Sequence, residues 1–303
     1  MSASVLIFAY NRPKHLANCL ESLINNSEAT STNFTVLIDG PKNSSDRKNQ
    51  SQMTKYLAEI RKKVSINYVL NTNNLGLSAS VIRGLDLMFK FNEEVIVVED
   101  DLVLSKHFLK FCNDGLKKFK YVEKVGSIQG FSYNFFEMQS SPYFLRGADC
   151  WGWATWQDRW KLFEPSSEIL IKIIKELNFK KNFDLNGAYP YFKMLQRESR
   201  GEVDSWAIRW HASMFINDKL SLYPNISLVR NDGFDGSGTH GNVSKKMNVK
   251  FPSEPIEIGD IPISESAMAL KQLELFLRER YSTFPNYSIR RFRQMVKRFR
   301  NKA

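Results

Sequence analysis

Cysteine is scarce in this chain, and its scarcity excludes two classes of protein. The sequence contains only Cys19, Cys112 and Cys150. Their odd number argues against a disulfide framework, and their spacing does not suit a cysteine-bound metal. We therefore interpret them as buried, reduced thiols of a cytosolic protein.

Long apolar runs are missing as well. No stretch of the sequence approaches the roughly 20 apolar residues that a membrane-spanning helix needs. The first apolar segment, Ser4–Ala9, is typical of a core strand, so we expect no signal peptide. The sequence thus predicts a cytoplasmic protein and excludes an integral membrane protein.

Acidic side chains are absent from residues 284–303, which hold seven basic residues of a chain with a net charge of +11. Apolar residues recur among them at helical spacing, at Ile289, Phe292, Val296 and Phe299. A basic amphipathic helix suits an anionic membrane surface, which predicts peripheral attachment to the inner face of the cell membrane. The alternative is a solvated helix that packs its stripe on the domain. No nucleic-acid-binding motif accompanies the charge, so no nucleic-acid partner is expected.

What the sequence does contain is an alternation of strand and helix patterns through residues 1–130. Strands are predicted at Ser4–Ala9, Phe34–Asp39, Ile66–Leu70, Val95–Glu99 and Val125–Gln129. Helices are predicted between them at Pro13–Ile24, Arg47–Lys62, Leu77–Phe91 and His107–Lys120. Such alternation is typical of an α/β fold with a mostly parallel central sheet and helices on both faces.

The character of the sequence changes after residue 130. Aromatic residues and glycines gather between Tyr143 and Trp160, and a glycine-rich stretch at Asn231–Lys245 predicts a mobile loop. Further helices are predicted at Ser167–Leu177, Tyr189–Arg200 and Ser205–Asn217. We expect one domain over residues 1–283, with a nucleotide-binding half (1–130) and an acceptor half (131–283), followed by the basic tail (284–303).

Three consecutive carboxylates, Glu99, Asp100 and Asp101, follow a short apolar strand. A strand of this kind is typically buried on both faces of a parallel sheet, and ligands bind at the carboxyl ends of such strands. The carboxylates repel one another, and a divalent cation that bridges to a phosphate offsets the repulsion. We predict that Asp101 binds Mn²⁺ or Mg²⁺ and that Asp100 contacts the ribose or a metal-bound water. Glu99 is predicted to contact the donor sugar or to orient the other two carboxylates. The alternative is acidic capping of the next helix.

Two other predicted strands end in polar residues at the same edge of the sheet. Arg12 follows the first strand, and its planar guanidinium can meet a phosphate. Asp39 ends the second strand and can accept a hydrogen bond from N3–H of a uracil. The alternative for Asp39 is ordinary turn chemistry before Gly40 and Pro41. Together with the triplet, these residues predict an enzyme that handles a metal-bound nucleotide.

Three motifs give the chain a family resemblance: Asn11-Arg12-Pro13, Asn74-Leu75-Gly76-Leu77 and Glu99-Asp100-Asp101-Leu102. They resemble the nucleotide-sugar-dependent glycosyltransferases of the GT-A fold, in particular the family-2-like group. The resemblance covers roughly residues 4–250 in scattered motifs. It implies that a metal-bound UDP-sugar lies on the acidic triplet and that the early Arg and Asp bind the nucleotide.

Within that group, Val95–Leu102 and the Ser237–Gly241 loop are most similar to the N-acetylglucosaminyltransferase I group. That similarity implies that His240 closes over the donor and contacts the diphosphate or the metal. The stretch Leu77–Arg83 lacks the aromatic and basic cluster that this group carries there, so the transferred sugar is left open.

The resemblance also implies a general base in the segment Gly201–Trp206. An Asp followed shortly by a Trp deprotonates the acceptor hydroxyl in the family, and Asp204 matches that pattern, with Glu202 as the nearby rival. A carboxylate aimed at a sugar hydroxyl supplies general-base catalysis, because the hydroxyl is a poor nucleophile. The alternative is that Asp204 only caps the following helix.

Trp153 is the remaining candidate for donor binding, since an indole can stack on a sugar face; the alternative is an ordinary aromatic core.

The combined prediction is a metal-dependent, inverting transferase. It moves a sugar from a UDP-sugar to a glycan or lipid-linked acceptor in bacterial surface polysaccharide synthesis. Two alternatives are a sugar nucleotidyltransferase and a non-catalytic glycan- or membrane-binding protein. The first would need a glycine-rich phosphate loop near the first strand, and Asn11-Arg12-Pro13 is not such a loop.

Overall fold

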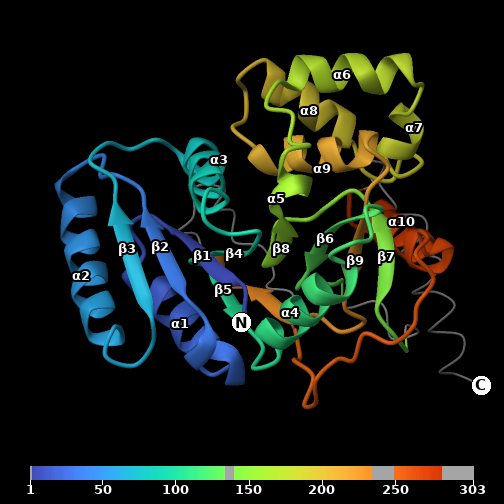
Figure 1. The fold of residues 1–303 in the computed structure, drawn as a ribbon. Helices are drawn as coiled ribbons and strands as arrows, with labels where there is room; N and C mark the ends of the chain where they lie inside the picture. The colour runs from blue at the N-terminus through green and yellow to red at the C-terminus, as the bar shows by residue number, and fades with distance from the viewer. Residues whose placement is uncertain (1, 134–139, 234–248, 282–303) are drawn as a thin grey trace, which may run out of the picture.

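A computed structural model describes residues 2–133, 140–233 and 249–281, and it is built on one eight-stranded sheet (Figure 1). The strand order is β3-β2-β1-β4-β8-β6-β9-β7. Four of the seven neighbouring pairs are parallel, namely β2–β3, β1–β2, β1–β4 and β6–β9. The predicted α/β fold with a mostly parallel sheet is therefore confirmed.

The strands of this sheet are β1 (Ser4–Ala9), β2 (Phe34–Ile38), β3 (Ile66–Leu70), β4 (Glu94–Glu99), β6 (Val125–Gln129), β7 (Tyr143–Arg146), β8 (Trp153–Trp156) and β9 (Leu220–Tyr223). A second, two-stranded sheet pairs β5 (Leu102–Leu104) with β10 (Val229–Asn231). All five strands predicted from the sequence are present, and β2 ends one residue earlier than predicted. β10 also takes Asn231 out of the predicted loop, most of which lies outside the described residues.

The first helices are α1 (Pro13–Ile24), α2 (Ser44–Ile60), α3 (Leu77–Met88) and α4 (Phe108–Phe119), with a 3-10 turn at Ser27–Ser31. The later ones are α5 (Gln157–Trp160), α6 (Ser167–Glu176), α7 (Lys180–Phe183), α8 (Tyr191–Ser199), α9 (Trp206–Ile216) and α10 (Ala267–Tyr281). Each predicted helix before residue 218 is present, with ends shifted by a few residues. α2, for example, starts earlier than predicted because the Asn43 side chain caps it by accepting from the Asp46 N–H at 3.0 Å.

The two faces of the sheet bury different sets of side chains. Along β4, Ile96 and Val98 pack in a core that includes apolar residues of α1, α2 and α4. Val95 and Val97 face the other way, into a core shared with α3, α5 and α9. The strand before the acidic triplet is thus buried on both faces, as predicted, which holds its carboxyl end in a fixed position.

Helices α6 to α9 form a separate layer against one face of the sheet (Figure 1). Tryptophans join that layer to the sheet: Trp153 of β8 stacks on Trp206 at a ring-centroid distance of 5.7 Å. The rings of Trp210 and Trp160 complete the cluster, 5.2 Å from each other. Trp153 is fully buried in this cluster, so the prediction that its indole stacks on the donor sugar is wrong. The alternative reading, an aromatic core, is the one that holds.

None of the helices in the described ranges is long and apolar enough to cross a lipid bilayer. The predicted amphipathic helix at residues 284–303 lies outside the described residues.

Candidate active site

Arg12 and the acidic triplet meet because their strands are parallel neighbours. Phe8 of β1 is in register with Glu99 of β4, so both chains leave the sheet at the same edge. The Arg12 guanidinium forms a short ion pair with Asp100 and lies 3.2 Å from Oδ2 of Asp101. The Asp100 side chain is only 2 % exposed and that of Arg12 18 %, so solvent screens this cluster little.

Negative charge exceeds positive charge at this point of the structure. Burial, and then the charges of Asp101 and Asp100, raise the pKa of Glu99 to about 8. Burial raises the pKa of Asp100 to about 6, although the Arg12 charge acts in the opposite direction. A single guanidinium therefore balances the three carboxyl groups incompletely, and an additional cation would be stabilised here.

Asp101 has the features expected of a ligand to that cation. Its Oδ1 atom is buried without a hydrogen-bond partner. Its backbone carbonyl accepts from the Asp232 N–H at 2.8 Å, and a Cβ at Gly233 would collide with its carboxylate. In the described part of the chain, no group of three or more His, Cys, Asp or Glu side chains could hold a metal ion. The buried, unpartnered Oδ1 atom of Asp101 fits a cation bound by one or two carboxylates and completed by substrate phosphates and water.

Asp39 holds a loop at the next position along the same edge. Its Oδ1 accepts from the N–H groups of Gly40 and Leu75, both at 2.9 Å, and its Oδ2 accepts from the Gly76 N–H at 2.9 Å. Gly40 lies so close to the backbone of Asn73 that a Cβ would not fit. The sequence suggested a nucleobase contact or a simple turn. The structure shows a clamp that fixes the start of α3.

Replacing Asp39 by Asn should lower the free energy of unfolding by about 1–3 kcal/mol. An amide can accept with its oxygen only, so its nitrogen would face one of the three backbone N–H groups and leave it unpaired in a buried position. Urea denaturation would measure the change. Asp260→Asn is the control, because that side chain is fully exposed and pairs only with Lys118. Equal stability of the two variants would contradict the clamp.

Asp204 lies beside the loop that Asp39 holds. A Cβ built on Gly76 would be 3.5 Å from Oδ2 of Asp204, in ordinary contact distance. Asp204 is exposed. It does not cap α9, because Ser205 is the N-cap residue and accepts from the Ile208 N–H. The alternative interpretation of Asp204 as a helix cap is therefore wrong, and its exposed carboxylate lies beside Gly76.

Glu202, the rival base, is already paired on the surface. Its two oxygens lie 3.1 Å from Nε of Arg197 and 2.6 Å from Nε of Arg200. Hydrogen bonds from Arg200 and Arg197 lower the pKa of Glu202, which makes it a weaker base. Glu202 is thus held in ion pairs on the surface, whereas Asp204 lies beside Gly76.

Arg209 links α9 to the start of α3, a role that the sequence did not reveal. Its Nη2 atom donates to Oγ of Ser78 in the first turn of α3, and its Nη1 atom donates to the Pro165 carbonyl at 3.0 Å. It also lies 3.3 Å from the Glu198 carboxylate of α8, with both side chains only 12 % exposed. This arginine therefore fixes α9, which begins just after Asp204, against the first turn of α3.

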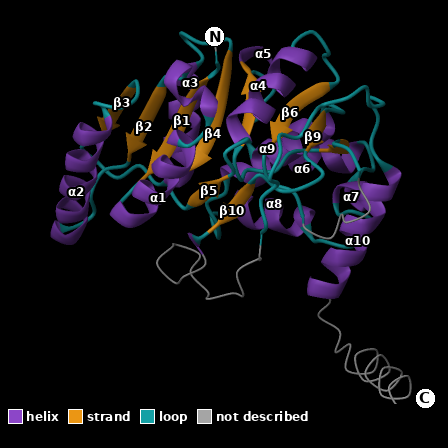
Figure 2. Cartoon of the chain, turned by 90° about the horizontal axis from the view of Figure 1, so that it is seen from below, coloured by secondary structure: helices purple, strands orange, loops and turns teal. Residues whose placement is uncertain are grey.

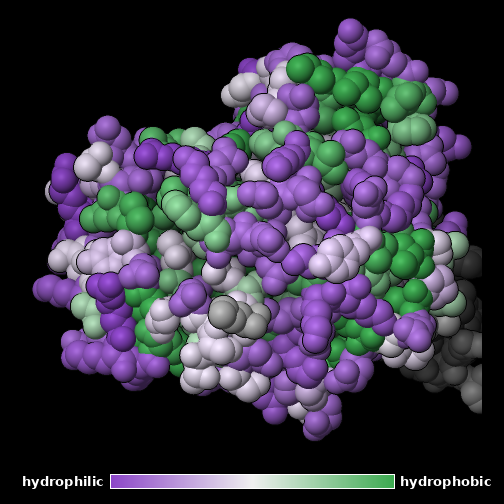
Figure 3. Space-filling model, in the orientation of Figure 1, coloured by the Kyte–Doolittle hydropathy of each residue, from purple (hydrophilic) through white to green (hydrophobic). Residues whose placement is uncertain are grey.

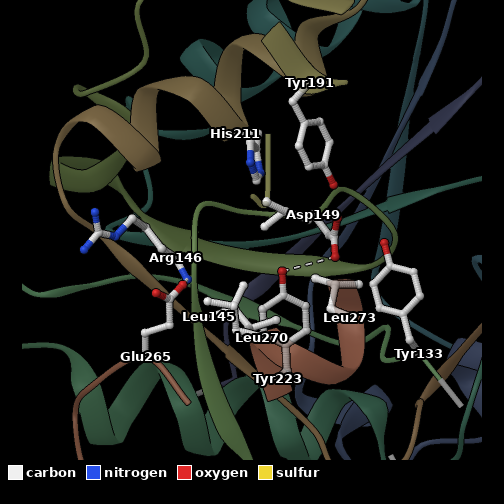
Figure 4. Close-up of a pocket in the computed structure, with 11 residues that line it drawn as sticks. Tyr133, Leu145, Arg146, Asp149, Tyr191, His211, Tyr223, Glu265, Leu270 and Leu273 are labelled. Atoms are coloured by element: carbon white, nitrogen blue, oxygen red, sulfur yellow. Dashed lines mark hydrogen bonds between the residues drawn. The ribbon is translucent and has the colours of Figure 1, made fainter. Parts of the chain in front are cut away.

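Asp149 is a half-buried carboxyl that the sequence did not single out (Figure 4). It accepts from the Tyr223 hydroxyl at 3.1 Å, and burial raises its pKa to about 6. The cavity around it, lined also by Tyr133, Tyr191 and His211, measures about 20 Å³. That is room for one water molecule and not for a sugar, so Asp149 supports the loop toward β8 rather than a ligand.

The sequence matches the profile of "Glycosyl transferase family 2" over residues 4–203, about two-thirds of the chain. The chain belongs to glycosyl transferase family 2. Membership in this family favours a glycosyltransferase over the sugar nucleotidyltransferase and the non-catalytic alternatives. The finer likeness to the N-acetylglucosaminyltransferase I group stays a prediction.

Solved glycosyltransferase structures overlap part of this family 2 fold. S. aureus TarS 1-349 is 13% identical, with a TM-score of 0.46, over 78% of this chain and 61% of that one. Its complex with UDP-GlcNAc matches over 45% of this chain and 38% of that one, at 18% identity and a TM-score of 0.36. The mannosyltransferase PcManGT from Pyrobaculum calidifontis, in complex with GDP-Man and Mn2+, is 14% identical with a TM-score of 0.34. The match covers 44% of this chain and 36% of that one. A comparison with curated proteins finds no match.

His240, predicted to close over the donor, lies outside the described residues. The structure thus brings together Arg12, Asp100 and Asp101 at one point of the edge, and Asp39 and Asp204 on either side of the Gly76 loop at another.

Proposed function

We propose that this family 2 enzyme transfers a sugar from a UDP-sugar to a hydroxyl of a glycan or lipid-linked glycan, with inversion at the anomeric carbon. The observation that carries the proposal is the arrangement of carboxylates along one edge of the sheet. A buried cluster with excess negative charge lies at the end of β4, and an exposed carboxylate, Asp204, lies beside the Gly76 loop. The cluster suits a metal-bound diphosphate, and the exposed carboxylate suits an incoming hydroxyl.

In this mechanism Asp204 is the general base. As the acceptor oxygen attacks the anomeric carbon, its proton moves to the Asp204 carboxylate and the bond from that carbon to the diphosphate breaks. UDP leaves with the electron pair. Attack from the face opposite the leaving group inverts the anomeric centre. Arg209 holds α9 against α3 and so keeps the base at a fixed place relative to the donor.

Arg12, Asp39 and the triplet bind and orient the donor in this proposal. Arg12 uses one nitrogen for the two aspartates, and a guanidinium has further N–H donors that can reach a phosphate. Asp39 fixes the loop that borders the nucleobase and can accept a hydrogen bond from N3–H of uracil. Asp100 contacts the ribose or a metal-bound water, and Glu99 contacts the donor sugar.

Asp101 would hold a Mn²⁺ or Mg²⁺ ion that stabilises the charge of the departing diphosphate. Removing divalent cations with EDTA should therefore abolish transfer, and adding back Mn²⁺ or Mg²⁺ should restore it. A panel of UDP-, GDP- and dTDP-sugars measures the effect and identifies the donor. The matched control is EDTA presaturated with Mn²⁺, which has no free capacity to take the cation from the enzyme. Full activity in excess EDTA would refute the metal assignment.

The acceptor belongs to the synthesis of a bacterial surface polysaccharide in this proposal, and residues 284–303 attach the enzyme to an anionic membrane. The support for the membrane attachment is the seven basic residues without an acid at residues 284–303, and the support for the acceptor is this segment together with the family. Such a segment gains about 1 kcal/mol for each Lys or Arg near an anionic surface. Attachment of this kind would bring the enzyme to a lipid-linked acceptor.

A further inference from the structure

The outermost strands of the sheet are β3 and β7, and each has one side without a neighbouring strand. Within the residues that the structure describes, the chain covers this outer side only at β7. At β7, the Phe144 carbonyl accepts from the Ser266 N–H at 2.8 Å, and the Arg146 N–H donates to Glu265 at 3.0 Å. Segment 265–266 therefore closes that edge. At the other end of the strand order, β3 pairs with β2 on one side and has no strand on its outer side. Figure 2 shows β3 and α2 at one end of the molecule and α10 at the other.

The outer side of β3 presents unpaired backbone groups. On the side toward β2, the Ser65 carbonyl accepts from the Phe34 N–H at 2.8 Å, and the Asn71 N–H donates to the Ile38 carbonyl at 2.9 Å. Because bonding direction alternates along a strand, the N–H and C=O groups of residues 66, 68 and 70 point outward. The Ile66 carbonyl is taken by Nε of Arg61 at 3.1 Å. In the part of the chain described, no hydrogen bond reaches those groups of Tyr68 or Leu70.

The side chains of this strand leave the edge unprotected. Tyr68, Val69 and Leu70 are 37%, 44% and 42% exposed. The strand has no charge, proline or glycine, which are the residues that normally prevent pairing at an edge. Figure 3 shows the hydrophobic area over the end of β3. An extended chain is the partner that can satisfy both the backbone and this surface.

A cavity of about 440 Å³ lies next to the same edge. Leu70 lines it together with Arg47, Ser51 and Thr54 of α2. Leu70 therefore faces α2, and Tyr68 faces the same way because side chains two apart share a face. The edge thus combines a protruding aromatic ring with a hollow beside it.

We propose that β3 pairs antiparallel with β3 of a second copy of this chain, around a two-fold axis at Val69. In this register Tyr68 exchanges both backbone hydrogen bonds with Leu70 of the partner subunit, and the symmetric pair adds two more. Opposed residues share a face, so the partner's Tyr68 lies over the cavity beside Leu70. A two-fold contact must be self-complementary, and this edge supplies both the ring and the hollow. This register also preserves the hydrogen bond from Nε of Arg61 to the Ile66 carbonyl.

Sedimentation analysis of the full chain over a range of concentrations tests the pairing. The wild type should show a monomer–dimer equilibrium. Val69→Lys and Val69→Glu should each raise the dimer dissociation constant at least about tenfold, because like charges would face each other across the axis. An equimolar mixture of the two variants should dimerise again. Tyr68→Ala should also weaken the dimer.

The control is Tyr121→Lys, at a side chain 88% exposed in the loop between α4 and β6, which should dimerise like the wild type. Circular dichroism checks that each variant is folded. A wild type that stays monomeric at all concentrations, or a Val69→Lys variant that dimerises normally, would overturn the proposal. Failure of the mixture to associate would overturn the two-fold register. None of these results depends on the sugar or metal that the enzyme uses.

Discussion

Asp204→Asn is expected to abolish sugar transfer while UDP-sugar binding stays intact. The amide cannot accept the proton of the acceptor hydroxyl, and a positioned general base contributes about 10²- to 10⁴-fold to the rate. The side chain is exposed and caps no helix, so the substitution should not disturb the fold. Turnover measured as UDP release, together with donor affinity from calorimetry, separates loss of chemistry from loss of binding.

Glu202→Gln is the matched control, since its carboxylate is committed to Arg197 and Arg200 on the surface. It should retain the wild-type rate. If the Asp204 variant kept its activity and the Glu202 variant lost it, the two residues would exchange roles. Equal activity of both variants would remove the segment from the mechanism.

The second large effect is expected for Arg12→Gln, which should lower the free energy of unfolding by about 3–5 kcal/mol. The substitution leaves Asp100 and Asp101 buried without their cation, and only 2% of the Asp100 side chain is exposed to solvent. Denaturation by urea at neutral pH measures the change. The loss should shrink as the pH falls, because protonated carboxyl groups no longer need the guanidinium.

Arg83→Gln is the control for that experiment. Arg83 is an exposed arginine of α3, and its loss should change stability by no more than about 0.5 kcal/mol. Equal stability of the Arg12 and Arg83 variants would show that the buried cluster does not depend on the arginine.

The sequence predicted best where local pattern and burial agree. β1, β3 and β6 have the predicted bounds because each is a short segment that begins or continues with β-branched residues between helical patterns. β7, β8 and β9 were not predicted, since strands of only four residues have no period long enough to recognise. Because β8 was not recognised as a strand, Trp153 was predicted to contact the donor sugar, whereas its side chain belongs to the core.

The candidate site was predicted as a set of residues but not as a network. The rule that parallel strands end at one edge places Arg12 and the triplet together. Nothing in the sequence indicated that Asp39 accepts from Leu75 and Gly76, or that Arg209 reaches Ser78. Those bonds join segments far apart in the chain, and only the folded topology sets which of the many possible pairs form.

The tryptophan cluster gives the enzyme a built-in optical reporter. Trp153 belongs to the sheet, whereas Trp206 and Trp210 belong to the helix that begins just after Asp204. The Trp153 ring centroid lies 5.7 Å from that of Trp206 and 5.4 Å from that of Trp210. Indoles this close couple their electronic transitions, so the near-ultraviolet dichroism of the cluster depends on how α9 sits on the sheet. Donor or acceptor binding that shifts the base by even a small rotation would thus be visible without any label.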